Sequence, residues 1–293
     1  MLLLTGATGL VGAALLRRLV AEGTPVRCLV RDPRQLGPQR VRVQIALGDL
    51  TDPPSFRNAL RGIHTVVHLA ASIRDQPLAS IEELNGIATW RMVEAAERAD
   101  VQRFLFFSAL GASTHHRARF FRAKALAEQA VREAGMRSTV FAPSIVYAPG
   151  DPWLSRLERL ALLPVMPVSG RGRALYQPIW AEDVADCVMA SLRRDGGMAH
   201  ERYELAGPDT LSHTEIIRAL LDSLNRQRVL AHVPIPVVSR GLRLLETLAG
   251  AHAFATWDEA ELMEVPMVSA TGAADAERLG VAPTPMRAVL GAG

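Results

Sequence analysis

The sequence predicts an α/β fold: a doubly wound parallel sheet with a smaller, mostly helical lobe towards the C-terminus. In the first half of the chain, short and nearly continuous apolar runs alternate with segments of helical spacing, as in βαβ units whose sheet is covered on both faces. After about residue 148 this alternation breaks and proline becomes frequent. We therefore predict a main domain of residues 1–148 and 173–207, and a lobe of residues 149–172 and 208–293.

The individual elements follow from the same patterns. Strands are predicted for the apolar runs at 1–5, 26–30, 41–47, 65–70, 103–108 and 138–143. Helices are predicted for the intervening segments 10–23, 54–62, 80–99 and 119–135. A helix over 180–194 and a strand over 202–207 return the chain to the main sheet, which then has about seven strands. In the lobe, 151–164 and 236–250 have helical spacing.

Composition excludes several classes of protein. The net charge of +3 is small and the basic residues are scattered, which argues against nucleic-acid binding. Cys28 and Cys187 lie far apart in apolar runs, so neither a disulfide nor a metal site is expected. No stretch approaches the length of uninterrupted apolar residues that a membrane span needs, and the N-terminus lacks the basic region and cleavage site of a signal peptide. We expect a cytoplasmic protein.

A glycine-rich turn lies between the first strand and the first helix. In "LLLTGATGLVGAALLRRL", Gly6, Gly9 and Gly12 are spaced three residues apart. Glycine permits a tight turn, a close approach of the backbone to a pyrophosphate, and close packing of helix against strand. The N-terminus of the helix then presents N–H groups and a partial positive charge to the phosphates. The motif predicts dinucleotide binding.

The end of the second strand bears on which dinucleotide binds. An acidic residue there takes the ribose hydroxyls of NAD, whereas arginine accommodates the 2′-phosphate of NADP. Arg31 lies at this strand end, Asp32 follows it, and Arg34 offers a second cationic contact. The pattern favours NADP(H), with NAD(H) still possible because of Asp32.

The motifs taken together are similar to those of the short-chain dehydrogenase/reductase superfamily, in its extended or atypical, epimerase-like branch. "TGATGLVG", "GDLTD", "VVHLAA", "FFSALGA", "KALAE", "APSIVYAPGD" and "YQPIWAEDVADCV" follow one another in the expected order. Within the superfamily the chain most resembles proteins similar to the dinucleotide-binding accessory subunit of respiratory complex I and the related NmrA-like proteins. The resemblance covers about residues 1–225 and implies a Rossmann-type domain followed by a substrate-binding lobe.

The resemblance also implies individual cofactor contacts. These are Thr8, Leu10 and Val11 in the glycine turn, Asp49 and Leu50 at the adenine, Leu69, Ala70 and Ala71 beside the fourth strand, and Pro143, Ser144 and Ile145 near the nicotinamide. Asn85 matches an asparagine often found in the fourth helix of the family, although a polar residue on a solvated helix face explains it equally well.

The catalytic signature of the superfamily is Tyr-x-x-x-Lys on one face of a helix. Lys124 is the only lysine of the chain and occupies the lysine position, where the resemblance implies a hydrogen bond to the nicotinamide ribose. Phe120 occupies the tyrosine position, and phenylalanine cannot donate a proton. Ser108 matches the active-site serine, although some members use the next position, which is Ala109 here. Other candidate proton donors are His115, His116, Tyr147 and Tyr176, each of which also has an ordinary packing or surface interpretation.

Three functions are compatible with these residues. The first, which we favour, is an NADP(H)-dependent oxidoreductase acting on a small apolar substrate, as a monomer or homodimer. The second is a non-catalytic dinucleotide-binding subunit or redox sensor, and the third is a non-redox isomerase, lyase or cyclase on the same scaffold. The substrate cleft is expected to be apolar and to lie near Ser108, Phe120, Tyr147 and the lobe, because Phe120, Phe121, Trp153 and Trp180 are the large side chains nearest to it.

Overall fold

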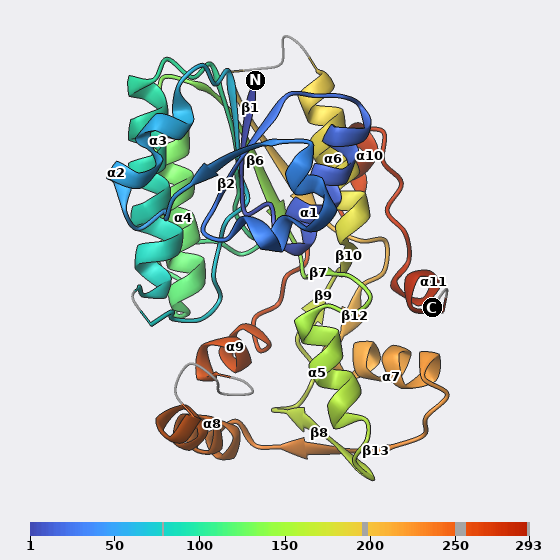
Figure 1. The fold of residues 1–293 in the computed structure, drawn as a ribbon. Helices are drawn as coiled ribbons and strands as arrows, with labels where there is room; N and C mark the ends of the chain where they lie inside the picture. Colours follow the sequence, from blue (N-terminus) through green and yellow to red (C-terminus); the bar gives the residue numbers. More distant parts are fainter. Residues whose placement is uncertain (78, 195–198, 250–255, 292–293) are drawn as a thin grey trace.

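The computed structural model describes residues 1–77, 79–194, 199–249 and 256–291, with the backbone alone for 243–249. Its centre is a seven-stranded sheet in which every strand pairs parallel to its neighbours. In spatial order the strands are β11 (His200–Leu205), β6 (Arg137–Pro143), β5 (Arg103–Phe107), β4 (Thr65–His68), β1 (Leu2–Thr5), β2 (Val26–Val30) and β3 (Gln44–Leu47). The predicted doubly wound sheet is confirmed (Figure 1).

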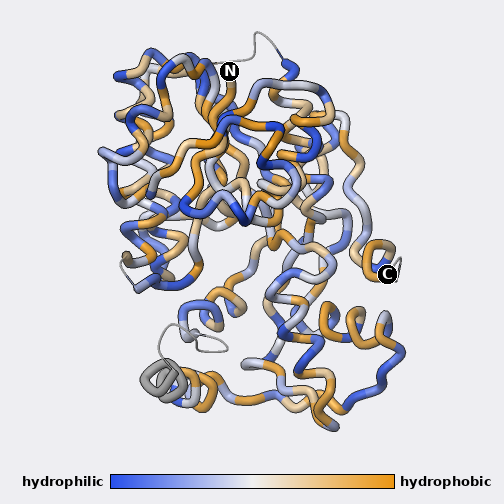
Figure 2. Tube along the Cα trace, in the orientation of Figure 1, coloured by the Kyte–Doolittle hydropathy of each residue, from blue (hydrophilic) through white to orange (hydrophobic). Residues whose placement is uncertain are grey.

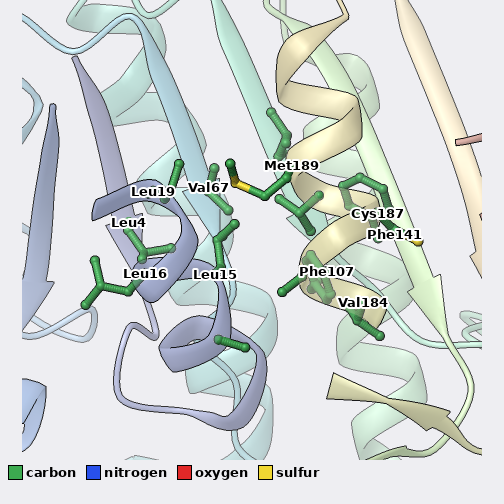
Figure 3. Packing of buried hydrophobic residues seen from close by; sticks show 14 of the residues in the cluster. Leu4, Leu15, Leu16, Leu19, Val67, Phe107, Phe141, Val184, Cys187 and Met189 are labelled. Atoms are coloured by element: carbon green, nitrogen blue, oxygen red, sulfur yellow. The ribbon is translucent and has the colours of Figure 1, made fainter. Parts of the chain in front are cut away.

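Helices cover both faces of the sheet, as the uninterrupted apolar strands predict. Helices α1 (Leu10–Ala21) and α6 (Ala181–Arg193) cover one face, and α3 (Ala88–Arg98) and α4 (Arg119–Glu133) cover the other. Successive residues of a strand point to opposite faces, so Leu4 packs under α1 in one core cluster and Leu3 lies in the other. Figure 3 shows the first cluster, in which Leu15 of α1 and Val184 of α6 lie over the sheet.

Three segments differ from the sequence-based elements. The helix predicted over 54–62 consists of a short α2 (Pro53–Phe56) and a 3-10 turn, η2 (Arg57–Leu60), and a 3-10 segment, η1 (Pro33–Val41), precedes β3. The long helix predicted over 80–99 begins with a π-helical turn, η3 (Glu83–Ile87). The third strand starts at Gln44 instead of residue 41, because Val41 is the last residue of η1 and is 81% exposed.

The lobe lies beyond the carboxyl ends of the strands (Figure 1). It contains α5 (Pro152–Leu160), α7 (His213–Ser223), α8 (Ile235–Ala249), α9 (Trp257–Leu262) and a parallel pair of strands, β8 (Val165–Ser169) and β13 (Val229–Val233). Two short pairs join lobe and sheet: β7 (Val146–Tyr147) with β10 (Ile179–Trp180), and β9 (Leu175–Tyr176) with β12 (Leu211–Ser212). In Figure 2 hydrophobic residues gather along the central strands, while hydrophobic and hydrophilic residues alternate along α3 and α4.

The C-terminal segment returns from the lobe to the sheet. In α10 (Ala274–Arg278), the carboxylate of Asp275 accepts a 2.8 Å hydrogen bond from the backbone N–H of Glu204 in β11. Further along, Asp183 of α6 accepts a 2.7 Å hydrogen bond from the N–H of Thr284, before α11 (Met286–Gly291) packs against the lobe. Among the helices of the described residues, none combines the length and the hydropathy that crossing a bilayer requires.

Candidate functional site

A cavity of about 320 Å³ opens where β1, β2 and β4 end. Parallel strands bring their carboxyl ends to one edge of the sheet, where α/β proteins bind ligands. Of the residues assigned to a cofactor from the sequence, Gly6, Thr8, Gly9, Arg31, Asp49, Leu50, Leu69, Ala70 and Ala71 line this cavity. The segments that carry them are separated in sequence and brought together by the parallel sheet.

The glycine turn leaves no room for side chains on its inner surface. Gly6 has a φ of +70°, and a Cβ on it would lie 2.6 Å from the backbone nitrogen of Ala70. A Cβ on Gly12 would lie 2.0 Å from the carbonyl oxygen of Gly6. The turn therefore packs directly against the start of α1, whose first N–H groups have no intrahelical acceptor. This backbone cradle fits the pyrophosphate of a dinucleotide.

The far end of the cavity carries the charged residues that follow β2. Arg31 and Asp32 both line it, and the side chain of Arg31 is exposed. The carboxylate of Asp32 accepts a 2.9 Å hydrogen bond from the backbone N–H of Arg34, which lies outside the lining residues. Asp49 uses its carboxylate locally, to accept hydrogen bonds from the N–H and hydroxyl of Thr51.

A buried chain of hydrogen bonds supports the floor of the cavity. The hydroxyl of Thr89 donates to the carbonyl oxygen of Asn85, so Nε2–H of His68 donates to Thr89 and Nδ1 of His68 accepts from the hydroxyl of Thr5. Burial and the nearby charge of Lys124 lower the pKa of His68 to about 3, which keeps the ring neutral. The chain thus fixes the end of β1 where the glycine turn begins.

Asn85 is buried and holds the loop that follows β4. Its amide oxygen accepts a hydrogen bond from the N–H of Ser72, and its amide nitrogen donates to the carbonyl oxygens of Ser72 and Ile81. The solvated-face interpretation of Asn85 is therefore wrong. Ser72 lines the first cavity and the next residue, Ile73, lines a second one, so Asn85 fixes the boundary between the two.

The second cavity has a volume of about 550 Å³, within the usual range for small-molecule sites. Its walls come from the ends of β5 and β6, from α4, and from α5, β8, α7 and α9 of the lobe. Most lining residues are apolar, among them Phe120, Phe121, Trp153, Leu157, Ile217 and Met263, together with Pro143 and Ile145. The apolar cleft expected from the sequence is present, although Tyr147 and Trp180 are not among its lining residues.

Ser108 and Phe120 line this cavity, whereas Lys124, which lies next to Phe120, is not among the lining residues of either cavity. The hydroxyl of Ser108, a residue 4% exposed, has no hydrogen-bond partner within the described residues. Lys124 is 2% exposed and its ammonium lies 5.8 Å from the centre of the Phe120 ring, so the two side chains share one face of α4 as their spacing predicts. Burial lowers the pKa of Lys124 to about 7. Unlike that of Ser108, the hydroxyl of Ser144 has hydrogen-bond partners. It donates to the carbonyl oxygen of Met267 and accepts from the N–H of Gln177.

The other candidate proton donors are not lining residues of the second cavity, although two of them contact residues that are. His115 is exposed, and His116 packs against Phe121 with its Nδ1 accepting from the N–H of Ala118. Tyr176 donates its hydroxyl to the carbonyl oxygen of Met263. Tyr147 is fully buried and burial raises its pKa. None of these four side chains lines the second cavity.

Two ion pairs of Glu259 lie at the second cavity, which Glu259 and Arg156 line. Glu259 of α9 binds Arg74, which follows β4, at 2.7 Å and Arg156 of α5 at 2.8 Å. Burial alone would raise the pKa of Glu259, but the hydrogen bonds and charges of the two arginines outweigh it and lower the pKa. The sequence analysis missed this group, because three residues so far apart along the chain carry no common local pattern.

His213 is a second polar residue of the cavity that the sequence analysis missed. It lines the cavity from α7, and both of its ring nitrogens are buried without a hydrogen-bond partner among the residues that the structure describes. The sequence analysis assigned no role to His213, which follows "TLS" at residues 210–212. His213 is buried by the packing of the lobe, and the local sequence does not predict that packing.

Comparison with known proteins supports this geometry. Residues 6–195 match the model of a family described as NAD(P)H-binding. A mitochondrial NADH dehydrogenase [ubiquinone] 1 alpha subcomplex subunit 9 of Arabidopsis thaliana is 28% identical over 79% of this chain, and the chain covers 60% of that relative's length. The Ceramide reductase of Caulobacter vibrioides is 30% identical over 80% of this chain and 73% of the reductase's length. The Sterol demethylase protein B of Methylococcus capsulatus is 30% identical over 83% of this chain and 80% of its own.

Solved structures agree at the level of the fold. A nucleoside-diphosphate-sugar epimerase from Staphylococcus aureus superimposes with a TM-score of 0.78 at 18% identity, over 99% of both chains. A UDP-glucose 4-epimerase from Thermus thermophilus, solved in complex with NAD, gives a TM-score of 0.73 at 18% identity, over 99% of this chain and 96% of its own. With the matched family, the glycine cradle and the parallel sheet, these likenesses establish that the chain belongs to the NAD(P)H-binding proteins of the extended or atypical short-chain dehydrogenase/reductase family.

Proposed function

We propose that this protein is an NADP(H)-dependent oxidoreductase that interconverts a carbonyl and an alcohol on a largely apolar substrate. The observation that carries the proposal is the buried hydroxyl of Ser108. It has no partner in the part of the chain that the structure describes, and it lies in the wall of an apolar cavity next to the dinucleotide cradle. Leaving a buried hydroxyl unpartnered is unfavourable, and a substrate oxygen is a suitable acceptor for it.

The residues of the first cavity would hold the cofactor: the glycine turn would bind its pyrophosphate and Arg31 its 2′-phosphate. When bound, it exchanges a hydride with the substrate carbon. Pro143, Ser144 and Ile145 support the nicotinamide end, because Pro143 and Ile145 line the second cavity where it approaches the sheet. Lys124, whose ammonium also donates to the carbonyl oxygen of Phe107, would hold the nicotinamide ribose. Arg31 favours NADP(H), since a guanidinium binds phosphate oxygens with charge-assisted hydrogen bonds.

Ser108 donates a hydrogen bond to the substrate oxygen and polarises the carbonyl. Phe120 shapes the site but supplies no proton, so the developing alkoxide takes its proton from solvent after hydride transfer. A general acid typically contributes about 10²–10⁴-fold to the rate. We therefore expect slow turnover, or a substrate that is intrinsically reactive, such as an enone or a quinone.

The substrate class follows from the walls of the second cavity. Burying apolar surface contributes roughly 25 cal/mol per Å², which favours a hydrocarbon-rich molecule over a sugar nucleotide. Two relatives, each 30% identical, carry names that refer to a ceramide and a sterol, and both compounds are largely apolar. The likeness to sugar-nucleotide epimerases, at 18% identity, supports the fold and not this choice of substrate.

A second candidate is a dinucleotide-binding subunit without catalysis. Phe120 in the tyrosine position favours it, and so does the similarity to a subunit of NADH dehydrogenase. The retained, buried Lys124 favours the enzyme, because a desolvated ammonium is unfavourable unless the site uses it.

The experiment that separates the two measures binding and turnover on the same protein. NADPH and NADH are titrated by fluorescence, and oxidation of each is then followed with a panel of long-chain carbonyls, enones and quinones. We expect preferential NADPH binding and its oxidation by at least one apolar compound. NADPH binding without oxidation by any of them would favour the non-catalytic subunit.

A further inference from the structure

His213 lines the second cavity, and its two ring nitrogens are available for hydrogen bonds to a ligand. The residue is 6% exposed, and neither Nδ1 nor Nε2 has a partner within the described residues. Among the described residues, six polar ones line the cavity: Ser108, Ser144, Arg156, Ser169, His213 and Glu259. Of these, Ser108 and His213 have buried polar atoms without a partner.

The helix that carries His213 does not need its side chain. Ser212 and Glu215 form a complete capping box at the start of α7, in which Ser212 accepts from the N–H of Glu215 and Glu215 accepts from the N–H of Ser212. Its neighbours in the cavity wall, such as Ile217 and Val168, are apolar. A leucine at this position would pack without leaving two nitrogens unsatisfied, so a purely structural role does not explain a histidine.

The imidazole is neutral, because burial lowers its pKa to about 4. A neutral imidazole offers one N–H donor and one nitrogen acceptor on opposite sides of the ring. A hydroxyl or an amide is the complementary ligand group, since each can both donate and accept. A carboxylate or a phosphate accepts only and matches the ring less well.

We propose that the cavity binds an elongated apolar substrate with two polar groups, the reacting carbonyl or alcohol at Ser108 and a hydroxyl or amide at His213. This inference rests on the proposed function and narrows its substrate class. Ser108 directly follows β5 of the sheet and His213 begins α7 of the lobe, so the two hydrogen bonds would hold the substrate to both parts of the molecule. His213 then selects the substrate without touching the reacting atoms.

The test compares matched ligands by binding, independently of turnover. Methyl ketones of increasing chain length, each paired with its analogue carrying a terminal hydroxyl, are titrated by calorimetry into the protein saturated with NADP⁺, which cannot reduce them. At the chain length that binds best, we expect the hydroxylated ligand to bind at least about tenfold more tightly than the plain ketone. A factor of this size corresponds to one hydrogen bond to an otherwise unsatisfied buried group. His213→Leu should abolish this preference and leave the plain ketone bound as well or better, while His213→Gln should keep part of it.

Two results overturn the inference: equal binding of the paired ligands at every length, or a preference that survives in His213→Leu. Binding of neither series also overturns it. The circular dichroism spectrum and melting temperature of each variant show whether it is folded. Failure of the proposed function looks different, because the wild-type preference and its loss in His213→Leu would then appear without any oxidation of NADPH.

Discussion

The ammonium of Lys124 donates a 2.6 Å hydrogen bond to the carbonyl oxygen of Phe107, the last residue of β5. This bond holds the only lysine of the chain against the carboxyl end of β5, at the residue that precedes Ser108. The ammonium is also close to the Phe106 ring, 4.9 Å from its centre. A backbone oxygen and a ring stabilise the cation only in part, and burial lowers its pKa to about 7.

The first prediction concerns stability and pH. The pKa of Lys124 is about 7 in the folded protein and near 10.5 when unfolded, so the unfolded chain binds more protons between these values. The contribution of Lys124 to stability therefore rises with pH from about 7 to about 10.5. Methionine cannot titrate, so the free energy of unfolding of Lys124→Met should exceed that of the wild type most at pH 7. This difference should shrink towards pH 10. Urea unfolding of both proteins across this range measures it, and a constant difference would contradict it.

The second prediction separates the roles of two neighbours on α4. Lys124→Ala should weaken NADPH binding, because the ammonium is proposed to hold the nicotinamide ribose. Phe120→Ala should change NADPH affinity little and weaken binding of apolar ligands, because Phe120 lines the second cavity. Fluorescence titration of NADPH into both variants measures the contrast. Unchanged affinity in folded Lys124→Ala would show that the lysine does not contact the cofactor.

The third prediction restores the missing acid. Phe120→Tyr places a phenol beside the Lys124 ammonium, which lowers the pKa of a phenol. Carbonyl reduction should accelerate by up to about 10²–10⁴-fold at saturating NADPH. The double variant Phe120→Tyr, Lys124→Met is the matched control, and it should lose most of the gain. A Phe120→Tyr variant that binds NADPH normally but reduces nothing new would favour the non-catalytic subunit.

The fourth prediction concerns the choice of cofactor. Arg31→Ala should weaken NADPH binding by about 1–3 kcal/mol and leave NADH binding almost unchanged, because only NADPH carries the 2′-phosphate. Arg34→Ala is the matched control, since Arg34 carries the same charge outside the lining of the cavity. Dissociation constants for both cofactors decide the matter, and equal losses for NADPH and NADH would refute the role of Arg31.

The fifth prediction concerns the glycine turn. In Gly12→Ala the added Cβ would lie 2.0 Å from the Gly6 oxygen, so the turn must move, and overpacking of this kind typically costs about 1–3 kcal/mol of stability. In Gly9→Ala the nearest heavy atom is 3.4 Å away. We expect Gly9→Ala to melt near the wild-type temperature while losing NADPH affinity, since its Cβ occupies space proposed for the pyrophosphate. Gly12→Ala should lower both the melting temperature and the NADPH affinity. Calorimetric melting and NADPH titration of the two variants measure this.

The sheet was predictable because its strands are apolar on both faces. Leu2, Leu3 and Leu4 are each buried, and the same holds for the apolar residues of β4 and β5, so local sequence alone identifies them. The short strands of the lobe were not predictable. β8 contains Pro167 and pairs with β13 more than sixty residues later in the chain, so its stability depends on a partner that no local pattern reveals.

The candidate site likewise has a part that the sequence predicts and a part that it does not. The lining of the first cavity follows from motifs, because Gly6 and Ala70 lie at strand ends whose positions the parallel sheet fixes. The second cavity depends on how the lobe packs. Glu259 and His213 enter it from segments without a distinctive pattern, and their partners, or the lack of them, are decided by tertiary structure.

The route of the chain between sheet and lobe has a consequence for folding. The chain leaves the sheet after β6, returns for β11, leaves again for α7, and comes back when Asp275 binds the N–H of Glu204. No single cut therefore separates the lobe as an independent module, and neither part has a contiguous sequence from which to fold alone. We expect the molecule to unfold in one cooperative transition, so that an apolar ligand bound in the lobe raises the melting temperature of the sheet as well.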